Sequence, residues 1–135
     1  MDWSDRMNAA ISYIEDNLAG EIDFNEAAKK ACSVVDECVG EVVNAIISKN
    51  GVALITADHG NSENMLDYNT NEPMTSHTTN FVWFSLVSKR ADLQKDKIWL
   101  KSSAGKLADV IPTLIEIMGL EKPKEMTGES LIERF

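Results

Sequence analysis

The sequence has few basic residues and no long hydrophobic run, and each shortage excludes a class of protein. Thirteen lysines and arginines stand against 22 aspartates and glutamates, which gives a net charge of -9. Such a surface repels a polyanion, so we expect no nucleic-acid partner. No apolar run approaches the roughly twenty residues that a helix needs to cross a bilayer, so we expect no membrane span.

Cysteine is also scarce, with only Cys32 and Cys38 in the chain. Their spacing within one predicted helix fits neither a metal site nor a redox motif. We therefore expect reduced, partly buried thiols in a cytoplasmic protein. The N-terminus is acidic and amphipathic rather than basic and then apolar, so no signal peptide is expected.

Only two histidines are present, His59 and His77, and both occur in polar loops beside predicted strands. The apolar run over residues 52–56 suits a buried parallel strand. Asp58 and His59 follow it, where open α/β sheets place their ligands. One carboxylate and one imidazole together suit Mn²⁺, Zn²⁺ or Fe²⁺. An Asp-His pair is also common as a hydrogen-bonded loop end, and its spacing alone leaves both interpretations open.

Apolar spacing predicts two helices and two further strands. Residues 24–49 carry a helical stripe of Ala27, Ala31, Val35, Cys38, Val42 and Ile46. A helix over residues 107–118 has an expected core face of Leu107, Val110, Ile111, Leu114, Ile115 and Met118. Pro112 predicts a kink in this helix, or a start nearer Ile111. Residues 81–87 are a predicted buried strand and residues 98–100 a short one, and the helix-then-strand order indicates an α/β domain.

Four motifs follow one another in a fixed order. They are Thr-Ala-Asp-His-Gly-Asn-Ser-Glu-Asn-Met at 56–65, His-Thr-Thr-Asn at 77–80, Gly-Lys-Leu-Ala-Asp-Val-Ile-Pro-Thr-Leu at 105–114, and Lys-Pro-Lys-Glu-Met-Thr-Gly-Glu-Ser-Leu-Ile at 122–132. From near Phe24 to the C-terminus the chain closely resembles the last part of cofactor-independent phosphoglycerate mutases, of the alkaline phosphatase superfamily. The resemblance implies a partial alkaline-phosphatase-like three-layer sandwich, with a small, mainly parallel sheet and helices on its faces.

The resemblance also implies a chemistry. In that family two Mn²⁺-type ions assist a serine that carries the phosphoryl group, so that 3-phosphoglycerate and 2-phosphoglycerate interconvert in glycolysis. By motif match, Asp58 and His59 would bind one ion and His77 the other, with Zn²⁺ or another divalent ion as an alternative to Mn²⁺. Asn61 and Glu63 are expected to hold one of the histidines in orientation.

Several parts of the family's machinery find no match in this sequence. The nucleophilic serine and the substrate-binding domain lie upstream in the whole enzyme, and Ser62 does not match that serine. An Asp-x-x-x-His pair expected just before the first long helix is replaced by Asn17 and Glu21. We therefore expect a mutase fragment that is inactive alone and binds metal weakly or not at all.

Residues 1–22 do not resemble the mutases. Their apolar residues recur at helical spacing, and their sequence is similar to the opening of an AraC-type helix-turn-helix domain. No recognition helix follows, which favours an amphipathic docking helix over a role on DNA. The predicted organisation is therefore an N-terminal helix of uncertain origin over 1–22 and a mutase-like domain over 23–135.

Two functions remain open at this point. The chain is either a piece of a mutase, to which a complementing fragment supplies the rest, or a non-enzymatic module for self-association or regulation. Phe81 and Trp83 occupy a stretch in which the family favours proline. An exposed sheet edge at residues 52–56 and 81–87 is expected to favour a homo-oligomer.

Overall fold

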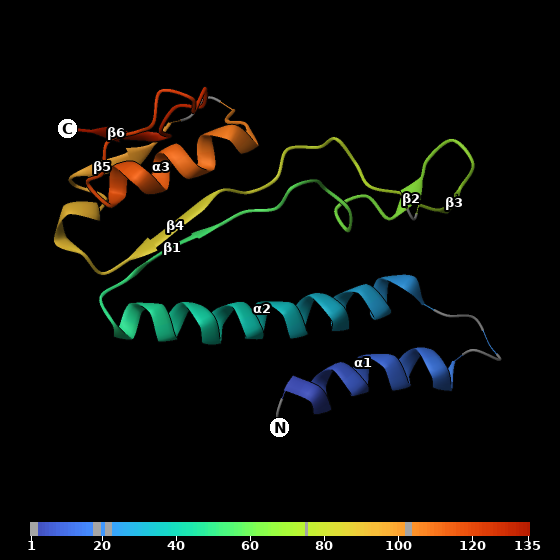
Figure 1. Cartoon of the computed structure of the whole chain (residues 1–135). Helices are drawn as coiled ribbons and strands as arrows, with labels where there is room; N and C mark the ends of the chain where they lie inside the picture. Colours follow the sequence, from blue (N-terminus) through green and yellow to red (C-terminus); the bar gives the residue numbers. More distant parts are fainter. Residues whose placement is uncertain (1–2, 18–19, 21–22, 75, 102–103) are drawn as a thin grey trace. The chain divides into compact units, whose positions relative to one another are not determined.

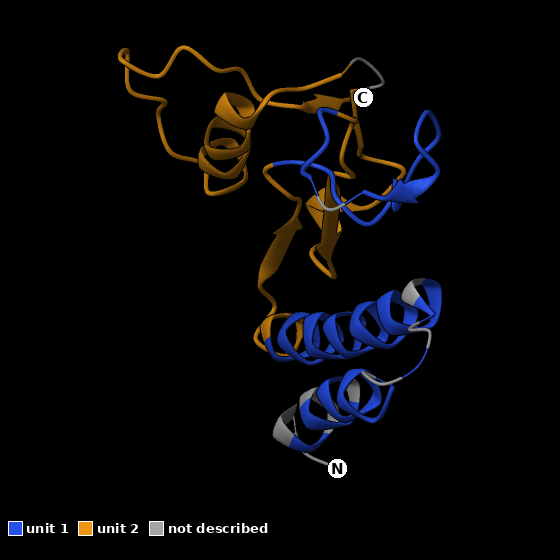
Figure 2. Ribbon diagram, turned by 90° about the vertical axis from the view of Figure 1, so that its right-hand side faces the viewer, with its two compact units in different colours: residues 1–45, 59–79 blue, residues 46–58, 80–135 orange. Residues whose placement is uncertain are grey.

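The computed structural model describes residues 3–17, 20, 23–74, 76–101 and 104–135 (Figure 1). The chain forms two compact units, coloured separately in Figure 2. Residues 1–45 and 59–79 belong to the first unit, and residues 46–58 and 80–135 belong to the second. No helix within the described ranges has the length and apolar character of a membrane span.

The first unit contains the helices α1 (Trp3–Asp16) and most of α2 (Phe24–Ser48). The predicted helix over 24–49 is thus confirmed. Asp23 caps α2, because its Oδ1 accepts hydrogen bonds from the backbone N–H groups of Asn25 at 2.9 Å and Glu26 at 3.2 Å. The two helices meet where Lys30 Nζ lies 5.1 Å from the ring centroid of Tyr13.

The predicted apolar stripe of α2 is covered only in part. Val35 and Val42 are exposed, whereas Val34, outside the predicted stripe, is buried. Helical spacing identifies an apolar face correctly, but burial also requires another element to pack on that face.

The rest of the first unit is a loop that returns on itself. Strand β2 (Leu66–Asp67) pairs antiparallel with β3 (Glu72–Pro73), and Asn71 takes a positive φ of 58° in the turn between them. Asparagine tolerates this conformation better than most residues. The small hairpin therefore lets the chain come back toward His59.

The described residues of the second unit form four strands and the helix α3 (Val110–Ile117), together with the last turn of α2. Strand β1 (Val52–Ile55) pairs with β4 (Ser85–Ser88), and β5 (Ile98–Leu100) pairs with β6 (Ile132–Arg134). The α/β class and the short strand at 98–100 are confirmed. Both pairings are antiparallel, so the expectation of a mainly parallel sheet, with a parallel strand at 52–56, is wrong for the described strands. The chain between β1 and β4 contains no crossover helix, which a parallel pair needs.

The predicted strand over 81–87 is also wrong in extent. Strand β4 begins only at Ser85, the partner of Ile55 at the end of β1. Residues before Ser85 lie beyond that end and have no strand to pair with. Phe81 and Trp83, expected in a buried strand, are 87% and 90% exposed.

The core of the second unit lies between α3 (Val110–Ile117) and the β5–β6 pair. Leu93, Ile98, Ile117 and Ile132 are its buried members. A 3₁₀ turn, η2 (Leu107–Asp109), precedes α3, so Pro112 falls in the first turn of the helix, where its missing N–H costs nothing. The prediction of a start near Ile111 is confirmed.

The face that α3 buries differs from the predicted one. Thr113 is fully buried, whereas Leu107, Ile111 and Met118 are exposed. The Thr113 hydroxyl donates to the carbonyl oxygen of Asp109 at 2.7 Å and accepts from the backbone N–H of Leu131 at 2.9 Å. A threonine with both hydrogen bonds satisfied can be buried at little cost, and apolar spacing does not detect this.

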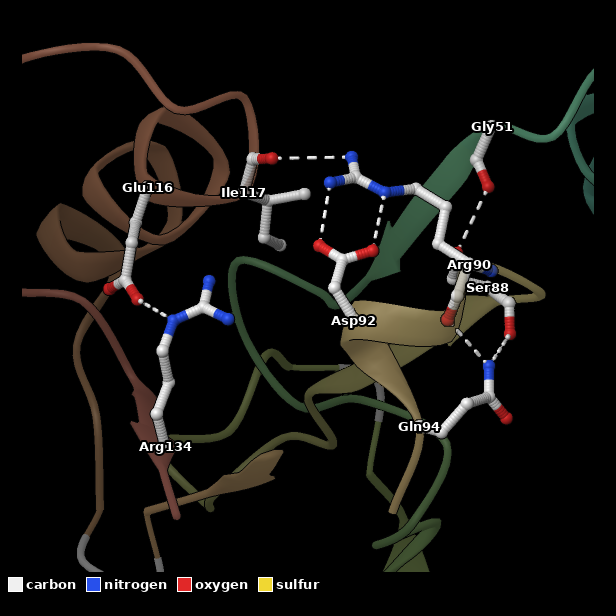
Figure 3. Close-up of polar contacts among 8 residues, drawn as sticks. All are labelled: Gly51, Ser88, Arg90, Asp92, Gln94, Glu116, Ile117 and Arg134. Atoms are coloured by element: carbon white, nitrogen blue, oxygen red, sulfur yellow. Dashed lines mark hydrogen bonds and ion pairs between the residues drawn. The ribbon is translucent and has the colours of Figure 1, made fainter. Parts of the chain in front are cut away.

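Two arginines fasten neighbouring segments to α3 (Figure 3). Arg90 donates to the carbonyl oxygen of Ile117 at 3.2 Å, at the C-terminal end of the helix, where a cation is favourable. Its other nitrogens donate to both carboxylate oxygens of Asp92, which lowers the pKa of that carboxyl. Arg134 of β6 donates to Glu116 at 3.2 Å.

Candidate metal centre

The loop of the first unit brings the two histidines together. The ring centroids of His59 and His77 lie 3.8 Å apart, and the ring planes are inclined by 33°. Gly60 and Thr78, the residues that follow them, form an isolated antiparallel bridge. The N–H of Thr78 donates to Gly60 O at 2.9 Å, and the N–H of Gly60 donates to Thr78 O at 3.3 Å. The backbone bridge therefore sets the contact between the rings.

A residue larger than glycine at position 60 would have to displace its neighbouring side chains. A Cβ atom there would overlap the Glu63 carboxylate and the Thr78 hydroxyl. The need for glycine at this position thus comes from the close approach of these side chains.

Glu63 connects the two sides of the bridge. Its Oε2 accepts the backbone N–H of Asn61 at 2.6 Å, and its Oε1 accepts the hydroxyl of Thr78. Through these hydrogen bonds Glu63 holds Asn61 and Thr78, which lie next to the two histidines in the loop. Thr78 did not stand out in the sequence, because a buried threonine in a polar loop has no spacing signal.

The hydrogen bonds at the rings decide which nitrogens can bind a metal. His59 Nδ1 lies 3.0 Å from the carbonyl oxygen of Gly60. A carbonyl only accepts, so Nδ1 carries the proton and Nε2 is the acceptor nitrogen of the neutral ring. Asn61 Nδ2 lies 3.2 Å from His77 Nδ1. When this amide donates to Nδ1, the proton of a neutral His77 ring is on Nε2.

Asp58 follows β1 at the end of the second unit's first segment and is exposed. It is joined to His59 by one peptide bond, so a carboxylate and an imidazole are neighbours in the chain. Across the described ranges, no three His, Cys, Asp or Glu side chains converge on one point. The donor types of Asp58, His59 and His77 nevertheless fit a divalent first-row ion, which binds imidazole nitrogen and carboxylate oxygen.

Asn17 and Glu21 stand where the resemblance places a metal-binding Asp and His. Asn17 donates its amide to the carbonyl oxygen of Tyr13 at 2.7 Å, at the end of α1. Glu21 lies outside the described residues.

Comparisons with known proteins agree with the motifs. A profile described as the metalloenzyme superfamily matches residues 13–122. The 2,3-bisphosphoglycerate-independent phosphoglycerate mutase of Clostridium kluyveri is 52% identical over 124 residues, which cover 91% of this chain and 23% of that protein. The corresponding mutase of Acetivibrio thermocellus is 48% identical over 122 residues, covering 90% of this chain and 22% of that one.

A solved structure gives the same result for the fold. A crystal structure of the Leishmania mexicana phosphoglycerate mutase, at low cobalt concentration, superimposes with a TM-score of 0.65 at 32% identity. The match covers 82% of this chain and 22% of the mutase chain. The mutase resemblance and the partial fold are therefore confirmed, and the chain spans less than a quarter of the length of these relatives.

Proposed function

Because the chain belongs to the metalloenzyme superfamily, we propose that it supplies Asp58, His59 and His77 as metal ligands of a cofactor-independent phosphoglycerate mutase. The reaction is the interconversion of 3-phosphoglycerate and 2-phosphoglycerate in the cytoplasm. The observation that supports this best is the contact between the two histidine rings, 3.8 Å apart, within motifs shared with the mutases.

The family and its structural neighbour support a divalent metal cofactor, and we propose Mn²⁺ as the ion. Such an ion lowers the pKa of a bound hydroxyl and neutralises charge on a phosphoryl group. Within this chain, His59 offers the lone pair of Nε2 because Gly60 holds the proton on Nδ1. Asp58, the preceding residue in the chain, offers a hard oxygen donor with a negative charge. His77 supplies the second imidazole.

The proposal assigns only part of the catalytic apparatus to these residues. The chain spans 23% of its mutase relatives, and the resemblance places the nucleophilic serine and the substrate-binding residues elsewhere in the enzyme. We propose that turnover requires a complementing mutase fragment. Asn61 and Glu63 have the supporting role of fixing the loop between the histidines, through the contacts of Asn61 with His77 and of Glu63 with Thr78.

A second candidate is self-association without catalysis. Phe81 and Trp83 are almost fully exposed just before the start of β4, in the stretch where the family favours proline. Large exposed apolar side chains beside a short sheet are typical of contact surfaces. This alternative needs no metal.

A Mn²⁺ titration by calorimetry tests the first proposal. We expect weak but measurable binding by the wild-type chain, and a loss of at least about tenfold in His59→Ala and Asp58→Asn. Asp96→Asn is the matched control, since Asp96 is an exposed carboxylate beside Lys97 in the β5 region. Absence of binding in all four proteins would overturn the metal assignment and leave self-association as the better candidate.

A further inference from the structure

Thr78 is unusual for its place in the chain. It is only 9% exposed, while its neighbours His77 and Thr79 are both exposed. A buried hydroxyl in a polar loop needs a hydrogen-bond partner, and here the hydroxyl donates to the carboxylate of Glu63, in the loop that joins the two histidines. We propose that Thr78 is a positioning residue that fixes both imidazole rings of the metal centre. This inference rests on the proposed function for the role of the two rings.

The backbone of Thr78 acts on His59. Its N–H donates to the carbonyl oxygen of Gly60 at 2.9 Å, and the same oxygen lies 3.0 Å from His59 Nδ1. One carbonyl therefore accepts both hydrogen bonds. The position of Thr78 sets the position of that acceptor, and the acceptor keeps the proton of His59 on Nδ1.

The side chain of Thr78 acts on His77 by a longer route. Its hydroxyl donates to Glu63 Oε1, and Glu63 Oε2 accepts the backbone N–H of Asn61. The Asn61 amide in turn lies 3.2 Å from His77 Nδ1. The hydroxyl thus holds a carboxylate, the carboxylate holds the backbone of Asn61, and the side chain of Asn61 meets the ring.

The same contacts give Glu63 a structural role in the loop. Both of its carboxylate oxygens accept hydrogen bonds from the loop that it closes. A Cβ at Gly60 would overlap Glu63 and Thr78, so the two side chains fill the space beside the bridge. Glu63 and Thr78 together form a clamp, which leaves the imidazoles to bind the cation.

The experiment compares three variants without metal. Thr78→Val removes the hydroxyl and keeps the shape, Thr78→Ser keeps the hydroxyl, and Thr79→Val is the same change at the exposed neighbour. Imidazole nitrogen NMR spectra are recorded at mildly alkaline pH, where free imidazole is neutral. Thr78→Val keeps the backbone N–H and loses only the hydroxyl, so we expect it to change the ring nitrogen spectrum of His77 and to lose the ring-to-ring NOE between the histidines. Thr78→Ser and Thr79→Val should retain both.

A second arm repeats the comparison with Mn²⁺. Loss of an outer-shell partner typically costs 10–100-fold in metal affinity, and we expect a loss of about tenfold or more for Thr78→Val only. If Thr78→Val alters the ring spectra but the wild-type protein binds no Mn²⁺, the result supports the clamp and contradicts the metal role. Wild-type ring spectra in Thr78→Val would overturn the clamp, whether or not metal binds. If Thr78→Val fails to fold, Glu63→Gln serves as a second variant, because it changes the partner of the Thr78 hydroxyl. Wild-type ring spectra in Glu63→Gln would likewise overturn the clamp.

Discussion

At the scale of single residues, one amide decides whether His77 is ready to bind a metal. With Asn61 Nδ2 donating to His77 Nδ1, the ring presents a protonated Nε2. A half-turn of the amide would instead place its oxygen beside Nδ1. That oxygen would accept a hydrogen bond from a protonated Nδ1, and Nε2 would then carry the lone pair. Metal binding at His77, as proposed above, would therefore select one of two orientations of Asn61.

Asn61→Asp should remove this choice. A carboxylate only accepts hydrogen bonds, so it would keep the proton on Nδ1 of His77 and raise the basicity of Nε2. We expect Mn²⁺ affinity to rise severalfold over wild type, measured by calorimetry. Asn69→Asp adds the same charge to an exposed position of the same loop and is the control for general electrostatic attraction. Equal gains in both variants would show that charge, not tautomer, causes the effect.

The motif match selected Asp58, His59 and His77 as candidate ligands, whereas the spacing of the Asp-His pair alone also left a hydrogen-bonded loop end open. The sequence could not predict that the rings meet, since this depends on the β2–β3 hairpin and on the Gly60–Thr78 bridge. Hydrogen bonds between distant residues leave no periodic pattern in a sequence. Thr78 was missed for this reason.

At the scale of elements, the start of α3 depends on one buried carboxylate. Asp109 accepts the backbone N–H groups of Glu129 and Lys106, both at 2.9 Å, and the Lys106 ammonium at 3.0 Å. These contacts, led by the one from Glu129, lower the pKa of Asp109 from 3.8 to about 2. A Cβ at Gly128 would overlap the carbonyl oxygen of Ala108, so the C-terminal segment can approach this closely only with glycine at that position. The carboxylate therefore ties the C-terminal segment to the helix.

The stability contributed by Asp109 should disappear in acid. Its pKa is lower in the folded chain than in the unfolded one, so the unfolded state binds more protons between pH 3.8 and about 2. Its stabilising effect is complete above about pH 4 to 5 and is lost as the pH falls toward 2. We expect wild type to exceed Asp109→Asn in urea midpoint at pH 5, and the difference to narrow steadily down to pH 2. A difference that stays constant over this range would contradict the assignment.

At the same scale, helices were easier to predict than strand pairing. The long helix over 24–49 follows from its periodicity and its Asp23 cap, and β5 from a short apolar run. The direction of the β1–β4 pair depends on what connects the strands, which apolar spacing does not encode. The stripe of α3 was assigned to the core because periodicity shows an apolar face without showing what covers it.

At the scale of the whole molecule, apolar side chains remain exposed where the sequence predicts burial. Within the second unit these are Leu107, Ile111 and Met118 around α3, and Phe81 and Trp83 before β4. The chain spans less than a quarter of the length of its mutase relatives. Apolar faces of helices and sheets are usually buried against another layer of structure. The same surfaces would serve either a complementing fragment or a second copy of this chain.

Self-association should therefore depend on Phe81 and Trp83. We expect light scattering of the wild-type chain to give a mass above the 15.0 kDa of one chain, rising with concentration. The double change Phe81→Ser and Trp83→Ser should return the mass to that of a monomer, because it removes the two most exposed aromatic side chains of the second unit. Tyr68→Ser is the control, since Tyr68 is equally exposed on the β2–β3 hairpin of the other unit. A monomeric wild-type mass at every concentration would reject self-association. The exposed faces would then be best explained by a complementing mutase fragment. Adding the remainder of a relative's chain and assaying for mutase turnover would test that explanation.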